Sequence, residues 1–241
     1  MDSMLLNWNT AIWFAAAAVV SYLLGSINFA IIFTRIFAKK DVRDVGSGNA
    51  GMTNAFRAGG KITGILTLIF DFGKAIAAVS LGRWLLPVFT QVETSNNFLS
   101  LVTFEAPALY GAMWCGLFVL IGHLYPVFFK FKGGKGVLTS AGTILLIDWR
   151  MFLIVLGVFM ICFAITRIIS ISSMIGSLAF PVSAWFLLSE YPQSVDWYNP
   201  PERVVGVIFA AIITLIIIVK HKDNIKRLLK GEEKRMNFGK K

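Results

Sequence analysis

Long apolar runs recur along the chain, and they constrain its fold more than any other feature. Six of them cover residues 11–33, 62–89, 107–129, 151–165, 168–189 and 204–219. A helix needs about 20 apolar residues to cross the hydrocarbon core of a bilayer, which is about 30 Å thick. Of the 241 residues, 56% are hydrophobic and 15% are charged, whereas a soluble domain carries about 25% charge. We therefore expect an all-α integral membrane protein.

A seventh apolar run, residues 137–147, is short. Fusing it with the next run would put Asp148 and Arg150 inside one long helix. It would also place every later loop on the opposite side of the membrane. The distribution of Lys and Arg favours separate helices, because these residues gather in cytoplasmic loops and seven spans place most of the 23 there. We predict seven transmembrane helices, with the N-terminus outside, a cytoplasmic C-terminus and a short fourth helix that begins near Gly133.

The net charge of +10 lies mostly on the predicted cytoplasmic face. Such a face suits anionic lipid headgroups and phosphorylated substrates, so we do not expect a nucleic-acid partner. The two cysteines, Cys115 and Cys162, lie inside apolar runs and indicate neither a disulfide framework nor a zinc site. The sequence shows no internal repeat and no separate soluble domain, so we expect a single polytopic membrane domain over residues 1–241. It does not indicate an oligomeric state.

The first predicted cytoplasmic loop is rich in glycine and in neutral polar groups. Its glycines allow positive φ angles and a close approach of the backbone to a ligand, and Arg57 offers a planar guanidinium suited to phosphate. If a helix begins near Gly51, then Asn54 and Arg57 fall on one face of it. A flexible connector would also be glycine-rich, so the local chemistry leaves both interpretations open. The candidate residues of this loop are Ser47, Gly48, Asn49, Asn54 and Arg57.

The second predicted loop combines lysines and glycines just before the short fourth helix. It reads Lys132-Gly133-Gly134-Lys135-Gly136. Backbone N–H groups at a helix N-terminus bind anions, and lysine adds positive charge. The loop is not a Walker A motif, because a glycine stands at position 136 where that motif has the Ser or Thr that binds Mg²⁺. The pattern indicates a phosphate cradle, although a basic cytoplasmic turn would look similar.

Both histidines, His123 and His221, lie at the predicted inner boundary of the membrane. A lone histidine at an interface is more often structural than catalytic, but Asn224 follows His221 by one helical turn and strengthens that position as a candidate. Within the second predicted span, Asp71 and Lys74 stand three residues apart. Charges inside a membrane are costly, so we expect these two side chains to pair with each other and support the fold.

Three motifs together resemble the bacterial acyl-phosphate-dependent glycerol-3-phosphate acyltransferase family, PlsY. The family's first motif, approximately Ser-Gly-Asn-x-Gly-x-x-Asn with a downstream Arg, matches Ser47 to Asn54 and Arg57. Its second, Gly-His-x-x-Pro-Val-Phe-Phe-x-Phe-Lys-Gly-Gly-Lys-Gly, matches residues 122–136 at every specified position. Its third, His-x-x-Asn-Ile-x-Arg-Leu-Leu-x-Gly-x-Glu, matches residues 221–233. The resemblance spans nearly the whole chain.

The resemblance implies transfer of a fatty acyl group from acyl phosphate to the sn-1 hydroxyl of glycerol 3-phosphate. The products are lysophosphatidic acid and phosphate, in the first acylation step of phospholipid synthesis. It also implies a multi-pass protein of the bacterial cytoplasmic (inner) membrane with its active site facing the cytoplasm. Acyl phosphate is already an activated mixed anhydride, so we expect no nucleotide, no other cofactor and no metal.

The resemblance also implies roles for individual residues. The implied catalytic residues are Ser47, Arg57, His221 and Asn224. The implied substrate- and phosphate-binding residues are Gly48, Asn49, Asn54, Lys132, Gly133, Gly134, Lys135 and Gly136. The implied structural supports are Asp71, Lys74 and Glu233. The general base is open between His221, His123 and a phosphate oxygen of the substrate, and we favour the phosphate because no carboxylate is clearly committed to the task.

Two other classes of protein fit part of the pattern. A small transporter of anionic substrates would also carry intramembrane charges, but here the polar residues gather at the inner boundary rather than at the midplane. A non-catalytic lipid-binding scaffold would tolerate replacement of Ser47 and Arg57. Incubation with acyl phosphate and glycerol 3-phosphate separates both alternatives from an acyltransferase.

Overall fold

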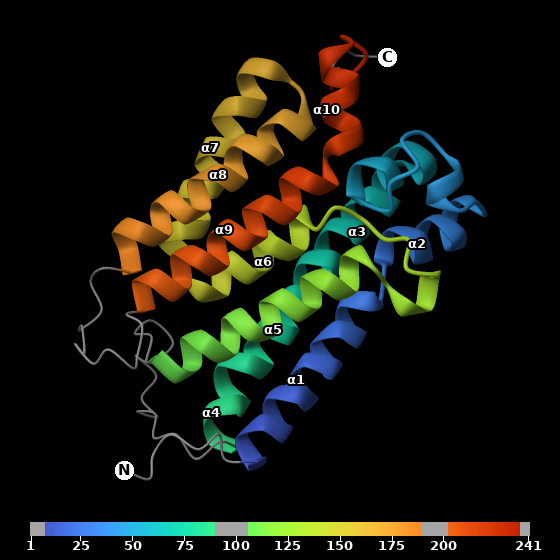
Figure 1. Cartoon of the computed structure of the whole chain (residues 1–241). Helices are drawn as coiled ribbons and strands as arrows, with labels where there is room; N and C mark the ends of the chain where they lie inside the picture. The colour runs from blue at the N-terminus through green and yellow to red at the C-terminus, as the bar shows by residue number, and fades with distance from the viewer. Residues whose placement is uncertain (1–7, 90–105, 189–201, 237–241) are drawn as a thin grey trace. The chain divides into compact units, whose positions relative to one another are not determined.

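The computed structural model describes residues 8–89, 106–188 and 202–236, and these residues form helices joined by turns and short loops, with no β-strand (Figure 1). The all-α prediction is therefore confirmed for the described part of the chain. The chain forms two compact units, Met1–Ile147 and Asp148–Lys241.

The described part of the first unit contains three long helices and several shorter elements. The described elements are α1 (Trp8–Ser26), α2 (Phe29–Ala38), η1 (Val42–Asp44), α3 (Met52–Ser80), η2 (Leu81–Leu85), α4 (Leu86–Phe89), α5 (Ala106–Leu124), η4 (Val127–Phe129) and α6 (Val137–Ile147). α1 packs along α5, and α3 packs against α2, α5 and α6. η1 and η4 are 3-10 turns, whereas η2 is a π-helical turn that follows α3 directly.

The first predicted span, residues 11–33, lies within one candidate membrane span of the structure, residues 11–38, but this span is not a continuous helix. α1 and α2 are separated by a break at Ile27 and Asn28, where the Asn28 side chain accepts a hydrogen bond from Ile31 N at 3.1 Å and caps α2. Lys74 Nζ donates to the carbonyl oxygens of Gly25, at 3.0 Å, and Ile27, at 2.8 Å. Polar groups of the chain therefore satisfy the exposed backbone at the break, as a membrane interior requires.

The third helix begins where the sequence predicted. Gly51 is the N-cap of α3, so Asn54 and Arg57 lie within its first two turns. Gly60 has φ 79° and ψ −168°, which are not helical angles, and it divides α3 into a short first segment and a long apolar one. Arg57 therefore lies on the short first segment of α3.

The short fourth helix begins later than predicted. Residues 132–136 are a loop, and α6 starts at Val137 instead of near Gly133. α6 ends at Ile147, and Asp148, in an extended conformation, accepts a hydrogen bond from Arg150 N at 2.7 Å as the N-cap of the next helix. The two apolar runs on either side of Asp148 are therefore separate helices, as predicted.

The second unit contains three long helices and one short one in its described part. These are α7 (Trp149–Thr166), α8 (Ile169–Leu187), α9 (Glu202–Lys220) and α10 (Lys222–Leu229). α8 packs against both α7 and α9. The turn between α7 and α8 is tight, with Arg167 at φ 57° and the Thr166 hydroxyl donating to Cys162 O at 2.8 Å.

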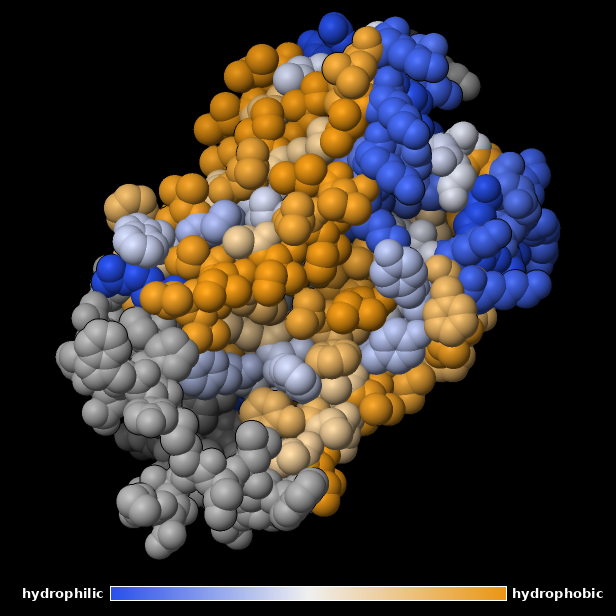
Figure 2. Space-filling view, viewed as in Figure 1, coloured by the Kyte–Doolittle hydropathy of each residue, from blue (hydrophilic) through white to orange (hydrophobic). Residues whose placement is uncertain are grey.

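Six helical segments of the described chain are long and apolar enough to cross a membrane, and they cover residues 11–38, 52–85, 108–129, 149–166, 169–187 and 203–220. Figure 2 shows apolar side chains over the surface of these helices. In the first unit, hydrophilic side chains gather around α2 and the start of α3, and in the second unit they gather along α10 (Figure 2). α6 has 11 residues, about 16 Å of helix, which is short of the roughly 30 Å of a bilayer core. A seventh crossing and the orientation of the termini stay predictions.

Two glycines let the backbones of α1 and α5 touch. A Cβ on Gly25 would overlap the carbonyl oxygen of Val119, and a Cβ on Gly122 would overlap that of Tyr22 and lie 3.0 Å from Cα of Gly25. Small residues allow this close approach of helices in membranes, where packing replaces the hydrophobic effect as the main driving force. The crossing of α1 and α5 therefore depends on both glycines.

We predict that Gly122→Ala destabilises the protein by about 1–3 kcal/mol, because the added methyl group has no space and forces the helices apart. Gly73→Ala is the matched control, since a Cβ on Gly73, also in a long helix of the first unit, meets no atom within 4 Å. Thermal unfolding in detergent measures the difference. Equal unfolding temperatures for the two variants would contradict this account of the crossing.

Candidate functional site

The loop between α2 and α3 is folded around the side chain of Asn54. Its amide nitrogen lies within hydrogen-bond distance of the carbonyl oxygens of Val42, at 2.7 Å, Val45, at 2.8 Å, and Asn49, at 3.1 Å. Its oxygen accepts a hydrogen bond from Ser47 N at 3.2 Å. Asn54 is 2% exposed, so the amide is occupied by the loop. This geometry favours a positioning role for Asn54 over the predicted direct contact with phosphate.

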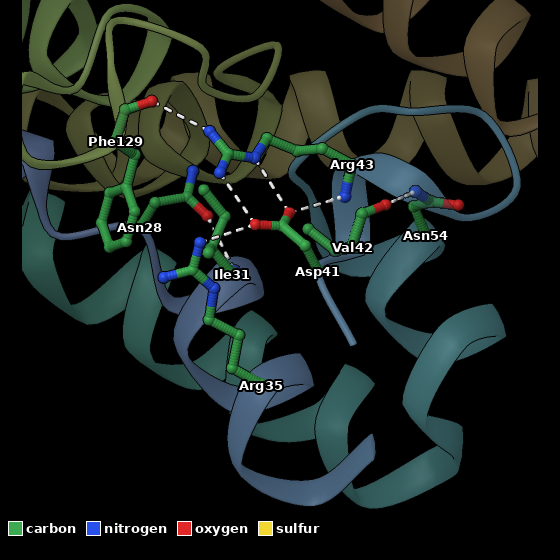
Figure 3. Close-up of polar contacts among 8 residues, drawn as sticks. All are labelled: Asn28, Ile31, Arg35, Asp41, Val42, Arg43, Asn54 and Phe129. Atoms are coloured by element: carbon green, nitrogen blue, oxygen red, sulfur yellow. Dashed lines mark hydrogen bonds and ion pairs between the residues drawn. The ribbon is translucent and has the colours of Figure 1, made fainter. Parts of the chain in front are cut away.

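Asp41 ties the start of the same loop to two arginines (Figure 3). Its Oδ1 accepts hydrogen bonds from the Arg43 backbone N–H and Nε, both at 2.9 Å, and its Oδ2 accepts from Arg43 Nη2 at 2.8 Å and Arg35 Nη2 at 2.7 Å. Hydrogen bonds from Arg43, joined by that from Arg35, outweigh burial and hold the pKa of Asp41 well below its usual range. Asp41 is therefore ionised at neutral pH.

Arg43 also connects this loop to the segment after α5. Its Nη1 donates to the carbonyl oxygen of Phe129 at 2.9 Å, and the guanidinium of Arg35 lies 5.8 Å from the centre of the Phe129 ring (Figure 3). None of Arg35, Asp41 and Arg43 was among the predicted site residues, because they precede the glycine-rich motif. The sequence signal that could have revealed this cluster is one aspartate, Asp41, between Arg35 and Arg43, just after the first predicted span.

The loop that these contacts hold presents several predicted site residues at its surface. Ser47, Gly48 and Arg57 are exposed, and Asn49 is half-buried. Within the described ranges, the Ser47 hydroxyl and the Arg57 guanidinium have no hydrogen-bond partner in the protein. A hydroxyl and a fixed positive charge are thus available to a ligand, and both suit a phosphate group.

The second loop is held against the end of α5 and against the first loop. Gly134 N donates to the carbonyl oxygen of His123 at 3.2 Å, and a Cβ on Gly134 would overlap His123 Nε2 and lie 2.6 Å from Ala50 O. A Cβ on Gly133 would overlap His123 O. The Gly133–Gly134 pair is therefore required by packing within the protein, and its role toward phosphate stays a prediction.

The rest of the second loop leaves its basic groups near the surface. Gly136 has φ 83°, which glycine adopts readily, and α6 begins at the next residue. Lys132 is exposed, whereas Lys135 is half-buried and has a partner within the protein. The structure thus brings together the loops that carry the first and second motifs, with Ala50 and Gly134 in contact.

A buried ion pair lies within the first unit, as predicted. Lys74 Nζ is 2.8 Å from Asp71 Oδ1, and the two side chains are 3% and 1% exposed. His123 joins them, with Nδ1 at 3.0 Å from Lys74 Nζ and 3.7 Å from Asp71 Oδ1. Sequence reasoning did not place His123 with this pair, because a separation of 49 residues gives no local signal.

In the second unit, Glu233 gathers the polar residues of the third motif. Its Oε1 accepts hydrogen bonds from Asn224 Nδ2, at 2.6 Å, and Ser170 Oγ, at 2.8 Å, and its Oε2 accepts from Arg227 Nε at 2.7 Å. Burial raises the pKa of Glu233, but these hydrogen bonds and the Arg227 charge outweigh it, so the net shift is downward. Glu233 therefore holds α10 and α8 together as a carboxylate, which agrees with the structural role expected for it.

His221 stands at the junction of α9 and α10 and is buried. Its Nδ1 lies 2.8 Å from the carbonyl oxygen of Ile217. A carbonyl oxygen accepts only, so Nδ1 must carry the proton, and Nε2 of the neutral ring is the acceptor. Asn224 follows one turn later, as predicted, but its amide nitrogen donates to Glu233.

Apolar helices of membrane-spanning length, with exposed basic and hydroxyl groups on glycine-rich loops, are typical of membrane proteins that bind anionic ligands. The family model described as glycerol-3-phosphate acyltransferase matches residues 15–231 of this chain. The chain belongs to that family and is an acyltransferase. The resemblance carried by the three sequence motifs is thus confirmed, and the reaction of the family belongs to phospholipid biosynthesis.

Individual relatives agree with this assignment. A glycerol-3-phosphate acyltransferase of Francisella tularensis subsp. holarctica is 37% identical over 218 residues, which cover 90% of each chain. One of Macrococcus caseolyticus is 33% identical over 226 residues, 94% of this chain and 98% of the relative. The crystal structure of PlsY, an integral membrane glycerol 3-phosphate acyltransferase, in its glycerol 3-phosphate form matches with a TM-score of 0.69 and 31% identity over 93% of this chain and 96% of that one. Its lysophosphatidic acid form matches with a TM-score of 0.67 and 30% identity over 93% and 95% of the two chains.

We predict that Glu233→Gln destabilises the protein by about 1–2 kcal/mol at neutral pH, through weaker hydrogen bonds to Asn224 and Ser170, with a small share from the partly exposed Arg227. Glu232→Gln is the control, since it removes the same charge from an exposed neighbour.

Acid should abolish this difference between the two variants. The folded pKa of Glu233 is below its ordinary value of 4.5, so its contribution is complete above pH 4.5 and disappears as the pH falls through the lowered value. Thermal unfolding of the two variants across this pH range measures the difference in stability between them. A difference that grows on acidification would contradict the assignment of Glu233 as a stabilising carboxylate.

Proposed function

We propose that the protein transfers a fatty acyl group from acyl phosphate to the sn-1 hydroxyl of glycerol 3-phosphate, and so forms lysophosphatidic acid and phosphate. The observation that carries this proposal is the contact between the first and second loops at Ala50 and Gly134, in a chain that belongs to the glycerol-3-phosphate acyltransferase family. One loop offers a hydroxyl and a guanidinium, and the other offers lysines and backbone N–H groups. Both substrates carry a phosphate, which these groups suit.

The proposed phosphate ligands are the exposed and loop residues of the first unit. Ser47 and Arg57 contribute side chains, and Gly48 and Asn49 keep the backbone close to them. The loop of Lys132, Gly133, Gly134, Lys135 and Gly136 contributes two positive charges next to the start of α6. Arg57 has the strongest case, because its guanidinium is exposed and has no partner among the described residues.

His221 and Asn224 are proposed to orient glycerol 3-phosphate. Glu233 holds the Asn224 side chain through the 2.6 Å hydrogen bond, and the Asp71–Lys74 ion pair is proposed to stabilise the fold of the first unit. Asn54 is proposed as a positioning residue of the first loop, since four backbone groups of that loop surround its amide.

The chemistry needs little beyond positioning and charge stabilisation. The sn-1 oxygen of glycerol 3-phosphate attacks the carbonyl carbon of the acyl phosphate, and a new ester C–O bond forms. The C–O bond to phosphate breaks, and its electron pair leaves with the phosphate. A phosphate oxygen of the substrate takes the hydroxyl proton in the favoured version, whereas His221 Nε2 takes it in the alternative. Arg57 and the lysines stabilise the charge of the departing phosphate.

We also propose that the protein is a single multi-pass domain of seven crossings in the bacterial cytoplasmic membrane. The N-terminus is outside, and the active site faces the cytoplasm, where glycerol 3-phosphate is dissolved. The positive charge of the predicted cytoplasmic segments supports this orientation. The charge also suits the anionic headgroups of the inner leaflet.

The donor is tested with purified protein in detergent. Radiolabelled glycerol 3-phosphate is incubated with palmitoyl phosphate, palmitoyl-CoA or palmitoyl-acyl carrier protein, and the lipids are separated by thin-layer chromatography. We expect lysophosphatidic acid acylated at sn-1 with palmitoyl phosphate alone. Product formed from a thioester donor alone would overturn the proposed donor. No product in detergent, together with uptake of labelled glycerol 3-phosphate by vesicles reconstituted with the protein, would favour the transporter.

We predict that Arg57→Lys lowers kcat/KM by about 10- to 150-fold, because a charged hydrogen bond is worth roughly 1.5–3 kcal/mol and each 1.36 kcal/mol is a factor of ten. Lysine keeps the charge but cannot form the two-point contact of a guanidinium with phosphate. Arg235→Lys, at an exposed arginine of the tail, is the control and should leave kcat/KM unchanged. A near-normal kcat/KM for Arg57→Lys would show that Arg57 is a positive charge at the membrane interface and not a phosphate ligand.

A further inference from the structure

His123 has a defined protonation pattern that follows from its neighbours. Lys74 Nζ has three N–H groups, and it lies within hydrogen-bond distance of three acceptors: Gly25 O at 3.0 Å, Ile27 O at 2.8 Å and His123 Nδ1 at 3.0 Å. Asp71 Oδ1, at 2.8 Å, supplies the opposite charge. The ammonium group of Lys74 therefore lies in direct contact with Nδ1 of the His123 ring.

This contact determines which nitrogen of His123 carries the proton. An ammonium group has no lone pair, so it can contact Nδ1 favourably only if Nδ1 accepts. The neutral ring must then carry its proton on Nε2. Asp71 does not change this assignment, because its nearer oxygen is 3.7 Å from Nδ1 and so beyond hydrogen-bond reach.

The protonated edge of the ring faces the second loop. A Cβ built on Gly134 would overlap Nε2 of His123 and would lie 3.1 Å from its Cε1. The backbone of the same two residues is also joined, since Gly134 N donates to His123 O at 3.2 Å. The ring is 4% exposed, and Gly134 is buried as well, so the contact is part of the protein interior.

We propose that His123 is a positioning residue for the loop of residues 132–136, and that Lys74 sets its tautomer so that Nε2–H faces Gly134. The inference rests on the proposed function, since it gives this loop a task in holding phosphate. It also removes His123 as a general base, because the only nitrogen near the loop already carries a proton. Lys74 and Asp71 then act on the loop through His123 without touching substrate.

The two histidines of the chain have opposite tautomers in this account. His123 carries its proton on Nε2, whereas His221 carries it on Nδ1, which donates to Ile217 O. The chain contains only these two, so a histidine-selective label gives two sets of ring signals. The assignment can therefore be tested without any substrate.

The direct experiment is ¹⁵N NMR of the full chain, labelled at histidine, in detergent micelles at neutral pH. Couplings from the ring nitrogens to the two carbon-bound protons distinguish Nδ1 from Nε2, and His221→Gln identifies the His123 signals. We expect Nε2 of His123 to be protonated and Nδ1 to be unprotonated. A proton on Nδ1, or on both nitrogens, would overturn the proposal.

Kinetics tests the effect on the loop with two variants of one side chain. In His123→Gln, the side-chain amide reaches the place of Nε2 and keeps a donor toward the loop, whereas in His123→Asn it reaches only the place of Nδ1. We expect His123→Asn to raise KM for glycerol 3-phosphate or acyl phosphate about tenfold, because the shorter side chain leaves the place of Nε2 beside Gly134 empty and lets the loop shift, with a smaller change in kcat. His123→Gln should stay within about threefold of wild type by the same measure.

The outcomes separate this inference from the function on which it rests. Equal KM values for His123→Asn and His123→Gln, whether normal or raised, would overturn the positioning role. A wild-type protein that forms no lysophosphatidic acid from acyl phosphate would overturn the proposed function. In that case the NMR result would still decide the tautomer that Lys74 sets.

Discussion

A single buried ammonium group, that of Lys74, satisfies the backbone where α1 and α2 are interrupted. The break between α1 and α2 exposes carbonyl oxygens at Gly25 and Ile27, and a membrane interior offers no water to satisfy them. Lys74 donates to both and is paired with Asp71, so the cost of burying a charge is offset by an ion pair and by hydrogen bonds. The same ammonium group contacts His123 and connects the break to the second loop.

Hydrogen bonds between backbone groups and side chains hold the loops at this end of the unit in place. The Asn54 amide forms hydrogen bonds within the first loop, and Asp41 accepts hydrogen bonds at the start of that loop. Arg43 connects the loop with Phe129. Since these side chains are occupied by the protein, the groups that the first motif offers to a ligand are the exposed Ser47 hydroxyl and Arg57 guanidinium. A site built on loops needs such a scaffold, because acyl transfer by positioning fails when the ligands move.

The sequence predicted the apolar helices and the family, but not the interruptions of the helices. Hydropathy detects a long apolar run, and the runs ending near Phe33 and Phe129 conceal breaks at Asn28 and Pro126 that one polar or proline residue makes. The ion pair of Asp71 and Lys74 was predictable, since three residues on a helix bring two side chains together. The motif residues were chosen for their chemistry, so Asn54, Gly133 and Gly134 were assigned to phosphate, whereas the structure shows their contacts within the protein. The partners of Asn54 are 5 to 12 residues away in a loop without helical or strand periodicity, so no local pattern reveals them.

The most direct test of the account is a structure of the protein with a non-hydrolysable acyl phosphonate in the place of acyl phosphate. The account predicts that the phosphonate oxygens contact the Arg57 guanidinium, the Ser47 hydroxyl and backbone N–H groups of the second loop other than that of Gly134, which donates to His123 O. It also predicts that His123 remains between Lys74 and Gly134, away from the ligand. A phosphonate bound elsewhere on the chain, with Arg57 and the second loop unoccupied, would contradict the central claim that these two loops form the phosphate site.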